Sequence, residues 1–349
     1  LMHLIVFLRP LGPPTCDREF RPQLGERGGE AMIRAICLNP VIDRSYHVNG
    51  FEPGKKYFHL LREVSIGGKG INVAKVCKQC GEPVMLYGFI AGSNGKMIRA
   101  YMEKEGIDAC LIEINGNTRE TINIIDLEQG RESELVEQGP TVEVRQVEQL
   151  LCRLREDLQR DDIVICSGMT IEGAPADLYS EISAMCRWKE ARCFLDTNSV
   201  TVEQLRKDGY YFYKPNLQEL FELFGREPVS DRTAVRKLAL QLVQDGVAFV
   251  LVSLGAEGGI LAGKDCCWEA KIPSVEVTST IGSGDSTVAG FAIGLRMGWS
   301  MEEIFRFSMA CGIANAMEKQ VGRVDPERLE MIKNKINIEN IPNKEVSHL

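Results

Sequence analysis

Residues 280–290 read TIGSGDSTVAG, so two closely spaced glycines and an aspartate open an apolar stretch of small residues. Glycines allow backbone N–H groups to approach a ligand closely, and the start of a helix presents unpaired N–H donors with a partial positive charge. An anion is therefore predicted to bind here. Asp285 would lie beside that anion, where a carboxylate is useful if it takes the proton from a hydroxyl that attacks phosphate.

The sequence on either side of this stretch alternates between short apolar runs and longer segments of helical period. The runs predict strands at 33–38, 84–89, 163–167, 193–196 and 248–253. The longer segments predict helices at 70–80, 95–105, 142–159, 174–188, 216–224, 231–245, 284–297, 301–319 and 326–336. This alternation indicates an α/β fold with a mainly parallel sheet, covered on both faces, and with ligands at the carboxyl ends of the strands.

Two insertions, at about 43–66 and 116–138, interrupt the alternation. Each contains short segments in which apolar and polar residues alternate, with turn signals such as Asn115-Gly116-Asn117. They predict a small antiparallel sheet built from two separate parts of the chain. Such a sheet over the mouth of an α/β domain could serve as a lid that excludes water from phosphoryl transfer.

The chain has 349 residues, of which 44% are hydrophobic, and this suits one large α/β domain or two modest ones. Its formal net charge of −8, with both signs interspersed, argues against a general nucleic-acid-binding protein. No run of about 18 apolar residues offers a membrane span, and a cytoplasmic location is expected. The twelve cysteines are scattered, and several fall inside apolar strand-like runs, so they are interpreted as reduced, buried thiols. The lone CxxC of Cys77 and Cys80 has no second such pair, which argues against a structural zinc site.

Residues 1–31 differ from the rest of the chain. They have neither the basic start nor the cleavage site of a targeting signal. A segment rich in Gly and Glu leads directly into Met32, where the first predicted strand begins. Our hypothesis is that Met32 is the true start and that 1–31 form an unfolded extension. Residues 341–349 are expected to form a tail.

A second glycine-rich motif, GGKGINVA, spans residues 67–74 and predicts a tight turn that runs into a helix. Lys69 supplies a point charge, and Asn72 on the same turn has both donor and acceptor atoms, which suits phosphate or a polyhydroxyl compound. The spacing matches neither a Walker loop nor GxGxxG. A structural strand-to-helix turn without a ligand is the alternative interpretation.

Two further motifs each allow a structural and a functional interpretation. KPNLQE, residues 214–219, is compatible with a capping box in which Asn216 begins a helix and Glu219 bonds back to it. It is also compatible with Lys214 near phosphate and with Asn216 and Glu219 holding water around Mg²⁺. SLGAEGG, residues 253–259, predicts a strand ending in a glycine turn, which could also form one edge of a nucleotide site.

All four motifs occur together, and in their order along the chain they resemble those of the PfkB branch of the ribokinase-like sugar kinases, from about Met32 to the end of the chain. The strings CLNPVID at 37–43 and GGKGINVA look most like 1-phosphofructokinases and tagatose-6-phosphate kinases. The resemblance implies a ribokinase-like three-layer α/β sandwich with a mainly parallel central sheet and a small β-sheet lid. It also implies a single kinase domain over 32–340, ATP and Mg²⁺, and a sugar or sugar phosphate as acceptor.

The resemblance further implies roles for residues at matching positions. Asp285 would be the catalytic base, and the N–H groups of Gly282, Ser283 and Gly284 would form the anion hole. The residues that would bind the acceptor are Asp43, Gly68, Lys69, Asn72 and Arg119. The residues that would bind the nucleotide are Lys214, Asn216, Ser253, Gly255, Gly258, Thr280 and Asn315. Asn216 and Glu219 would hold Mg²⁺ indirectly, through water.

Departures from the family pattern concentrate where the acceptor should bind. Tyr57 and Phe58 stand in a lid strand where phosphofructokinase-type members usually carry Asn-Arg, and Val136 and Met169 replace polar residues. We expect a kinase for a ketohexose phosphate, namely fructose 1-phosphate, tagatose 6-phosphate or fructose 6-phosphate. A kinase for an unphosphorylated sugar or a nucleoside is one alternative, and a non-catalytic sugar-binding regulator is another. A homodimer formed through the lid is the expected assembly.

Overall fold

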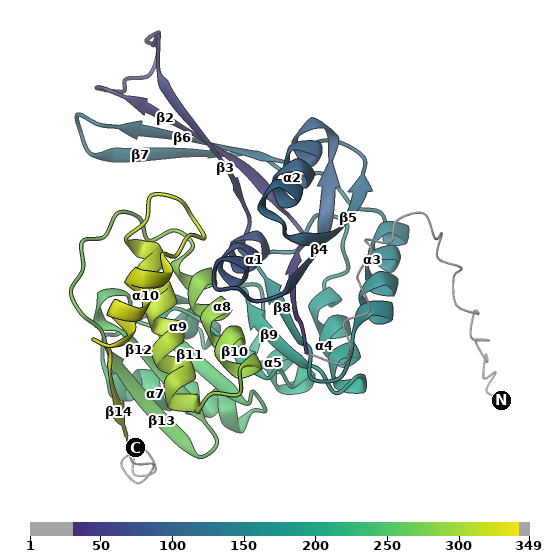
Figure 1. Cartoon of the computed structure of the whole chain (residues 1–349), viewed down its shortest axis with the longest axis vertical. Coiled ribbons are helices and arrows are strands. Elements are labelled where there is room, and N and C mark those ends of the chain that lie inside the picture. Colours follow the sequence, from purple (N-terminus) through teal and green to yellow (C-terminus); the bar gives the residue numbers. More distant parts are fainter. Residues whose placement is uncertain (1–30, 342–349) are drawn as a thin grey trace, which may run out of the picture.

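Ten strands form the central sheet of the computed structural model, which describes residues 31–341 (Figure 1). They are β1 (Ile33–Cys37), β4 (Val84–Ala91), β5 (Asp108–Ile114), β8 (Ile163–Ser167), β9 (Arg192–Asp196), β10 (Phe212–Tyr213), β11 (Phe249–Ser253), β12 (Gly259–Gly263), β13 (Cys266–Lys271) and β14 (Asn337–Asn340). Their order across the sheet is β14-β13-β12-β11-β10-β9-β8-β1-β4-β5. The strands from β11 to β5 in this order are parallel, whereas β12, β13 and β14 pair antiparallel at one edge.

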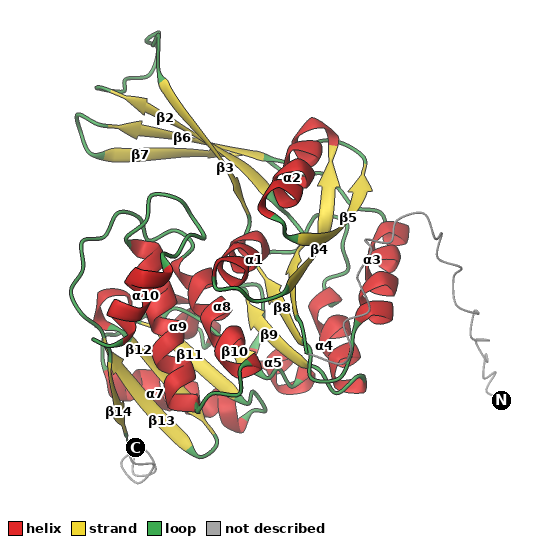
Figure 2. Cartoon of the chain, viewed as in Figure 1, coloured by secondary structure: helices red, strands yellow, loops and turns green. Residues whose placement is uncertain are grey.

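Helices cover both faces of this sheet (Figure 2). One layer consists of α1 (Lys69–Gln79), α2 (Gly92–Glu105), α8 (Ser283–Arg296), α9 (Met301–Ala316) and α10 (Pro326–Lys333). The other layer consists of α3 (Val144–Asp157), α4 (Leu178–Trp188), α5 (Val202–Asp208), α6 (Leu217–Leu223) and α7 (Arg232–Gln244). A short 3-10 helix, η1 (Gly255–Glu257), follows β11.

The side chains of β1 show why two helical layers are needed. Ile33 and Ala35 belong to the hydrophobic core on the α1 and α8 side, whereas Ile36 belongs to the core on the α3 and α4 side. All three residues are fully buried. Because successive side chains of a strand point to opposite faces, a strand buried on both faces needs a helical layer on each. The predicted three-layer α/β sandwich with a mainly parallel sheet is confirmed.

A separate sheet of four strands projects from this body (Figure 1). It consists of β2 (Val41–Val48), β3 (Leu61–Gly67), β6 (Glu120–Asp126) and β7 (Arg131–Val136), in the order β3-β2-β6-β7. Its two halves are antiparallel hairpins, but β2 pairs with β6 in parallel. The prediction of a wholly antiparallel sheet is therefore wrong. Both hairpins leave the central sheet beyond the carboxyl end of a parallel strand, β1 or β5, so their first strands run the same way.

The position expected for Tyr57 and Phe58 in a strand is also wrong, because β3 begins only at Leu61. Both residues lie in the loop between β2 and β3, where His59 has a φ of 55° that interrupts an extended strand. The Tyr57 hydroxyl donates to the carbonyl of Gly50 at 3.0 Å and accepts from the N–H of Glu52 at 2.7 Å. Tyr57 therefore braces its own loop.

Several short or half-polar elements are not predicted by the sequence pattern. They are α5, β5, β12, β13 and β14. The hypothesis about residues 1–31 and the predicted tail at 341–349 lie outside the described residues, except for Ala31 and Ile341. Within 31–341, no helix is long and apolar enough to cross a membrane.

Candidate active site

The residues singled out by the four motifs gather at the carboxyl edge of the parallel strands. Asp196 ends β9, Lys214 follows β10, and Ser253 ends β11. The small sheet returns to this edge through β3, whose last residue, Gly67, is followed closely by α1. The topology therefore brings segments far apart in sequence to one site, as expected for an α/β fold.

Asp285 is the central acidic group of the site. It lies in the first turn of α8, is 5% exposed, and its Oδ2 accepts a 2.7 Å hydrogen bond from Nδ2 of Asn72. This bond joins the first turn of α8 to α1 and fixes the direction in which the carboxylate points. The two motifs that carry Asp285 and Asn72 thus meet in space, although 213 positions separate the two residues.

Asp196 is a site residue that the motif search missed. Its Oδ1 lies 3.4 Å from Nζ of Lys69 and 3.4 Å from Nζ of Lys214, so one buried carboxylate holds the ammonium groups from two motifs. Its other oxygen, Oδ2, is buried without a hydrogen-bond partner among the described residues. The available signal was an acidic residue at the carboxyl end of a predicted apolar strand, where a parallel sheet places its ligands.

The charges in this cluster shift one another's pKa values. Burial, followed by the negative charge of Asp196, raises the pKa of Asp285 to about 6, against the opposing effects of Lys69, Asn72 and Lys214. Burial alone would also raise the pKa of Asp196, but Lys214 and Lys69 lower it below its ordinary value. At pH 7 the site therefore contains two ionised carboxylates with different roles, one paired with lysines and one able to accept a proton.

The turn before α8 has the shape of an anion cradle. Gly282 precedes the helix with a φ of 78°, a left-handed conformation that favours glycine. The Lys214 ammonium lies against this turn. If Gly284 had a side chain, its Cβ would be 3.1 Å from Nζ of Lys214. The N–H of Ser283 donates to the carbonyl of Thr280 at 3.2 Å, and Thr280 itself is exposed. The helix start thus faces solvent with a cation beside it, as an anion site requires.

Asn315 lies behind this cradle. It is 1% exposed, and its Nδ2 donates to the carbonyl of Ile281 at 2.8 Å and to Ser283 Oγ at 3.4 Å. Its Oδ1 accepts from the N–H of Gly322 at 2.8 Å. Since both polar atoms of the side chain are used within the protein, Asn315 contributes by shaping the cradle.

The KPNLQE motif begins α6 next to β11. Asn216 Oδ1 accepts from the N–H of Glu219 at 2.9 Å, and Glu219 Oε2 accepts from the N–H of Asn216 at 2.8 Å, which completes a capping box. The capping box leaves Oε1 of Glu219 unused. Asn216 also forms a parallel bridge to Ser253, so this motif and the SLGAEGG turn are neighbours.

In the SLGAEGG turn, Gly255 is exposed and Gly258 is buried. Gly258 has a φ of 92° and packs so closely on the Ala270 carbonyl of β13 that a side chain would collide with it. Gly258 therefore shapes the turn, and Gly255 presents its backbone to solvent.

Asp43, in β2 of the small sheet, and Arg119, directly before β6, form one side of the site. Burial raises the pKa of Asp43, and the neighbouring charges of Arg119 and Lys75 oppose this effect. The Asp43 carboxylate lies directly against Gly67, where any side chain would collide with Oδ2. Gly68, with a φ of 114°, packs on Cys37 and Pro40 and turns the chain into α1.

Several buried polar atoms at this edge have no hydrogen-bond partner among the described residues. They are Asn72 Oδ1, Arg119 Nε, Ser167 Oγ and Asp196 Oδ2. Buried polar groups are nearly always hydrogen-bonded in folded proteins, so a cluster of unsatisfied ones calls for an explanation. A polar ligand or ordered water at this edge provides it.

The apolar departures noted in the sequence lie around the same edge. Val136 pairs with Thr121, which pairs with Asp43, so these three residues share one face of the small sheet. Met169 follows β8, and both Val136 and Met169 are exposed at 58% and 61%. Phe58, 73% exposed, lies in the loop between β2 and β3.

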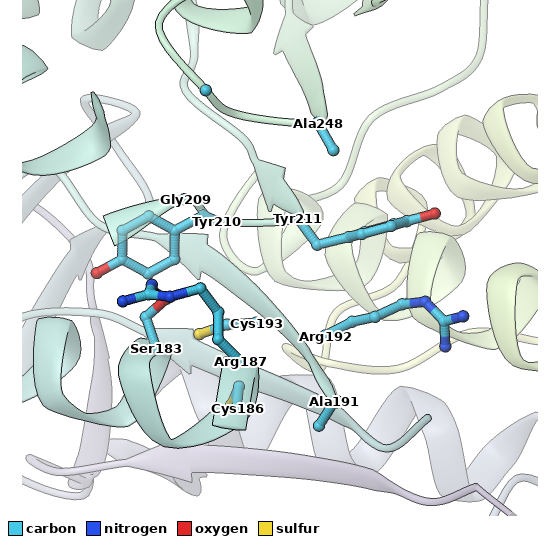
Figure 3. Close-up of a pocket in the computed structure, with 11 residues that line it drawn as sticks. Ser183, Cys186, Arg187, Ala191, Arg192, Cys193, Gly209, Tyr210, Tyr211 and Ala248 are labelled. Atoms are coloured by element: carbon cyan, nitrogen blue, oxygen red, sulfur yellow. The ribbon is translucent and has the colours of Figure 1, made fainter. Parts of the chain in front are cut away.

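A cavity of about 160 Å³ lies at the opposite end of the strands (Figure 3). Arg192 and Cys193 at the start of β9, and Tyr211 and Ala248 just before β10 and β11, line it. Because the four motifs lie at the carboxyl ends of these strands, this cavity does not belong to the site.

Comparisons with known proteins agree with this geometry. The chain matches the family described as pfkB family carbohydrate kinase over residues 38–328. It is 30% identical over 309 residues to the tagatose-6-phosphate kinase of Staphylococcus epidermidis, which covers 88% of this chain and 99% of that protein. It is 32% identical over 291 residues to the 1-phosphofructokinase of Bacillus subtilis, covering 83% and 94%. The structure of phosphofructokinase-2 from Escherichia coli in complex with substrates and products has a TM-score of 0.79 at 25% identity, covering 87% of this chain and 98% of that one.

Proposed function

Because the chain belongs to the pfkB family of carbohydrate kinases and has their ribokinase-like fold, we propose that it transfers a phosphoryl group from ATP to a hydroxyl of a ketohexose phosphate. The candidate acceptors are fructose 1-phosphate, tagatose 6-phosphate and fructose 6-phosphate. The observation that carries this proposal is the buried Asp285 in the first turn of α8, held by Asn72 and adjacent to the lysine pair on Asp196.

Asp285 acts as the general base. A carboxylate with a pKa of about 6 is mostly ionised at pH 7, and its basicity suits proton transfer near that pH. The hydrogen bond from Asn72 to Oδ2 orients the carboxylate and leaves Oδ1 to accept the proton of the attacking hydroxyl. General base catalysis of this kind typically contributes about 10²- to 10⁴-fold to the rate.

The anion hole is the second element of the mechanism. The N–H groups of Gly282, Ser283 and Gly284 stabilise the negative charge that develops on the transferred phosphoryl group, together with the dipole of α8. The Ser283 N–H donates to the Thr280 carbonyl at 3.2 Å, so it must break this hydrogen bond before it can donate to the phosphoryl group. Lys214 and Lys69, held by Asp196, place two positive charges beside the same oxygens.

The nucleotide would bind along the edge formed by Ser253, Gly255 and Thr280, with Lys214 near its phosphates. Mg²⁺ fits the donor set here, because the capping box uses only Oε2 of Glu219 and Asp196 Oδ2 has no hydrogen-bond partner among the described residues. Carboxylate oxygens are the hard ligands that this ion prefers. Asn216 and Glu219 would hold it through water. When bound, Mg²⁺ supplies positive charge to the phosphate oxygens.

The acceptor would bind between the small sheet and α1. Asp43, held against Gly67, would accept hydrogen bonds from sugar hydroxyls, and the backbone at Gly68, packed on Cys37 and Pro40, would lie beside the acceptor. The guanidinium of Arg119, whose Nε lacks a partner among the described residues, would contact an anionic substituent of the sugar. Movement of the small sheet over this acceptor is part of the proposal, because closure excludes water.

An unphosphorylated sugar or a nucleoside is the second candidate acceptor. Val136, on the Asp43 face of the small sheet, and Met169 present apolar surface where relatives are expected to have polar contacts. Losing one hydrogen-bond partner typically costs about 1–3 kcal/mol, so an acceptor with fewer polar substituents would lose less here.

A homodimer through the small sheet is also proposed. The face opposite Asp43 carries a row formed by Val64, Arg44, Ile122 and Leu135. Val64 and Leu135 are 42% and 57% exposed. A second copy of the same face would bury the three apolar side chains of this row, while Arg44 is paired with Glu120. The cytoplasmic location expected from the sequence stays a prediction.

A screen of ADP release across sugars, sugar phosphates and nucleosides tests these alternatives, with Asp285→Asn as the control. We expect turnover with a ketohexose phosphate and a loss of about 10²- to 10⁴-fold in the variant. Turnover only with unphosphorylated compounds would favour the second candidate. Tight sugar binding without ADP release from any acceptor would identify a regulator and reject the kinase assignment.

A further inference from the structure

Lys75 is a buried cation that the proposed mechanism does not use. It follows Asn72 by one turn in α1 and is 7% exposed. Its Nζ donates to the carbonyl of Ile66 at 2.5 Å and to the carbonyl of Val321 at 3.4 Å, and it lies 5.3 Å from the ring centre of Tyr101. Burying an ammonium is costly, and here that cost is offset by two carbonyls, one 9 residues before Lys75 and one 246 residues after it.

The first carbonyl belongs to the base of the small sheet. Ile66 pairs with Ile42 in β2, next to Asp43. Gly67, the next residue, is the one against which the Asp43 carboxylate packs. A shift of the small sheet relative to the central sheet must therefore move the Ile66 carbonyl that Lys75 holds.

The second carbonyl belongs to the α9–α10 loop, residues 317–325, which supports the anion cradle. A Cβ placed on Gly282 would be 2.5 Å from Cγ1 of Val321, so this side chain packs directly on the cradle. The N–H of the next residue, Gly322, donates to Asn315, which in turn donates to the Ile281 carbonyl. The loop thus contacts the cradle both through a side chain and through a hydrogen-bonded relay.

Gln79 offers a comparison on the same helix. It donates to the carbonyl of Gly322 at 2.8 Å and accepts from the N–H of Val324 at 3.0 Å. Within the described residues, Gln79 therefore bonds to the α9–α10 loop but not to the small sheet. Lys75 differs because it bonds to that loop and to the small sheet at once, and α1 itself contacts both β3 and α8 (Figure 1).

We propose that Lys75 is a positioning residue that couples the base of the small sheet to the anion cradle through the α9–α10 loop. The proposal rests on the proposed function, because coupling matters only if acceptor and phosphate must be aligned. When the small sheet moves over an acceptor, Lys75 transmits the change at Ile66 to Val321 and so to Gly282. Phosphoryl transfer is sensitive to misplacements of about 1 Å, so this link affects turnover.

The coupling depends on the charge of Lys75. Burial lowers its pKa to about 8, while the titratable groups facing it oppose that shift: mainly the carboxylates of Asp43 on β2, Glu105 at the end of α2 and Asp285 on α8, and last Cys37 on β1, whose own pKa is raised to about 11 by burial. The ammonium is therefore charged at pH 7 and is lost as pH rises above about 8. Its hydrogen bonds to the two carbonyls weaken when the charge is lost.

Backbone amide hydrogen exchange in the ligand-free protein tests the coupling without any substrate. Lys75→Met removes the donors but keeps the length of the side chain, and Lys75→Arg keeps the charge. Lys78→Met, at an exposed position of the same helix, is the matched control. We expect exchange at 65–67 and at 281–284 to be roughly tenfold faster in Lys75→Met and unchanged in the other two variants. Unchanged exchange at 281–284 in a folded Lys75→Met protein would overturn the proposal.

Kinetics provide the second measurement, using whichever sugar phosphate the wild-type protein phosphorylates. Lys75→Met should lower kcat by roughly ten- to a hundredfold. In the wild type kcat should decline above about pH 8, and in Lys75→Arg this decline should move to higher pH. The same decline in both proteins would reject the coupling, even if Lys75→Met failed to fold. Absence of turnover in the wild type would count against the proposed function, while the exchange result would still decide on the coupling.

Discussion

Asp196→Asn provides a sharp test of how the site tunes its base. In the structure the negative charge of Asp196 helps to raise the pKa of Asp285 to about 6, whereas Lys69 and Lys214 lower it. Removing the carboxylate charge while leaving both lysines should lower this pKa, by about one unit if Asp196 acts like a typical nearby charge. The acid limb of the pH profile should therefore move to lower pH.

The magnitude follows from the ionised fraction of Asp285. With a pKa of about 6, roughly nine-tenths of the carboxylate is ionised at pH 7 but only about one-tenth at pH 5. With a pKa near 5, about half is ionised at pH 5. Relative to its own plateau, the variant should thus retain about fivefold more kcat/KM at pH 5 than the wild type, although its plateau is lower because the lysines have lost their partner.

The assay is ADP release at several acceptor concentrations between pH 4.5 and 8, with each enzyme normalised to its own maximum. Comparing two proteins on the same substrates cancels the ionisation of ATP and of the sugar phosphate. If the acid limb of the kcat/KM profile lies at the same pH in both proteins, or at higher pH in Asp196→Asn, the assignment of this limb to Asp285 is refuted.

Three further predictions concern the base, the cradle and the dimer. Asp285→Asn should raise the free energy of unfolding at pH 7 by about 3 kcal/mol, because folding raises the pKa of the native carboxyl from 3.8 to about 6. Denaturant titration should show this gain above about pH 6 and its loss as the pH falls towards 4. Gly282 has a φ of 78°, and a Cβ added there would lie 2.5 Å from Cγ1 of Val321, so Gly282→Ala should lower kcat at least tenfold and cost about 1–3 kcal/mol of stability. Gly298 has a φ of 68° but open space around the added Cβ, so Gly298→Ala should reduce stability without lowering kcat. Leu135→Glu should raise the dimer dissociation constant roughly a hundredfold in sedimentation measurements, because it buries a charge; an equal effect of Val136→Glu, on the opposite face, would argue against the proposed interface.

Much of the fold was predictable because it depends on local patterns. The alternation of apolar runs and helical segments predicts the three layers, and the buried residues of β1 show the same logic in space. The pattern fails where burial is one-sided or an element is short, as in α5 and β14. The family resemblance placed Tyr57 and Phe58 in a lid strand, and the left-handed conformation of His59, which ends that expectation, leaves no clear mark in the sequence.

The sequence by itself determined the family and the chemistry of the motifs, because a glycine turn with an aspartate at a helix start imposes its geometry locally. Only the tertiary structure decided which groups act on one another. The lysines of two motifs meet on Asp196, a residue that belongs to no motif, and Lys75 joins the small sheet to the cradle. Two of these four contacts, Lys69 with Asp196 and Lys75 with Val321, join residues more than a hundred positions apart. A pKa depends on distance and burial, which the folded chain alone sets.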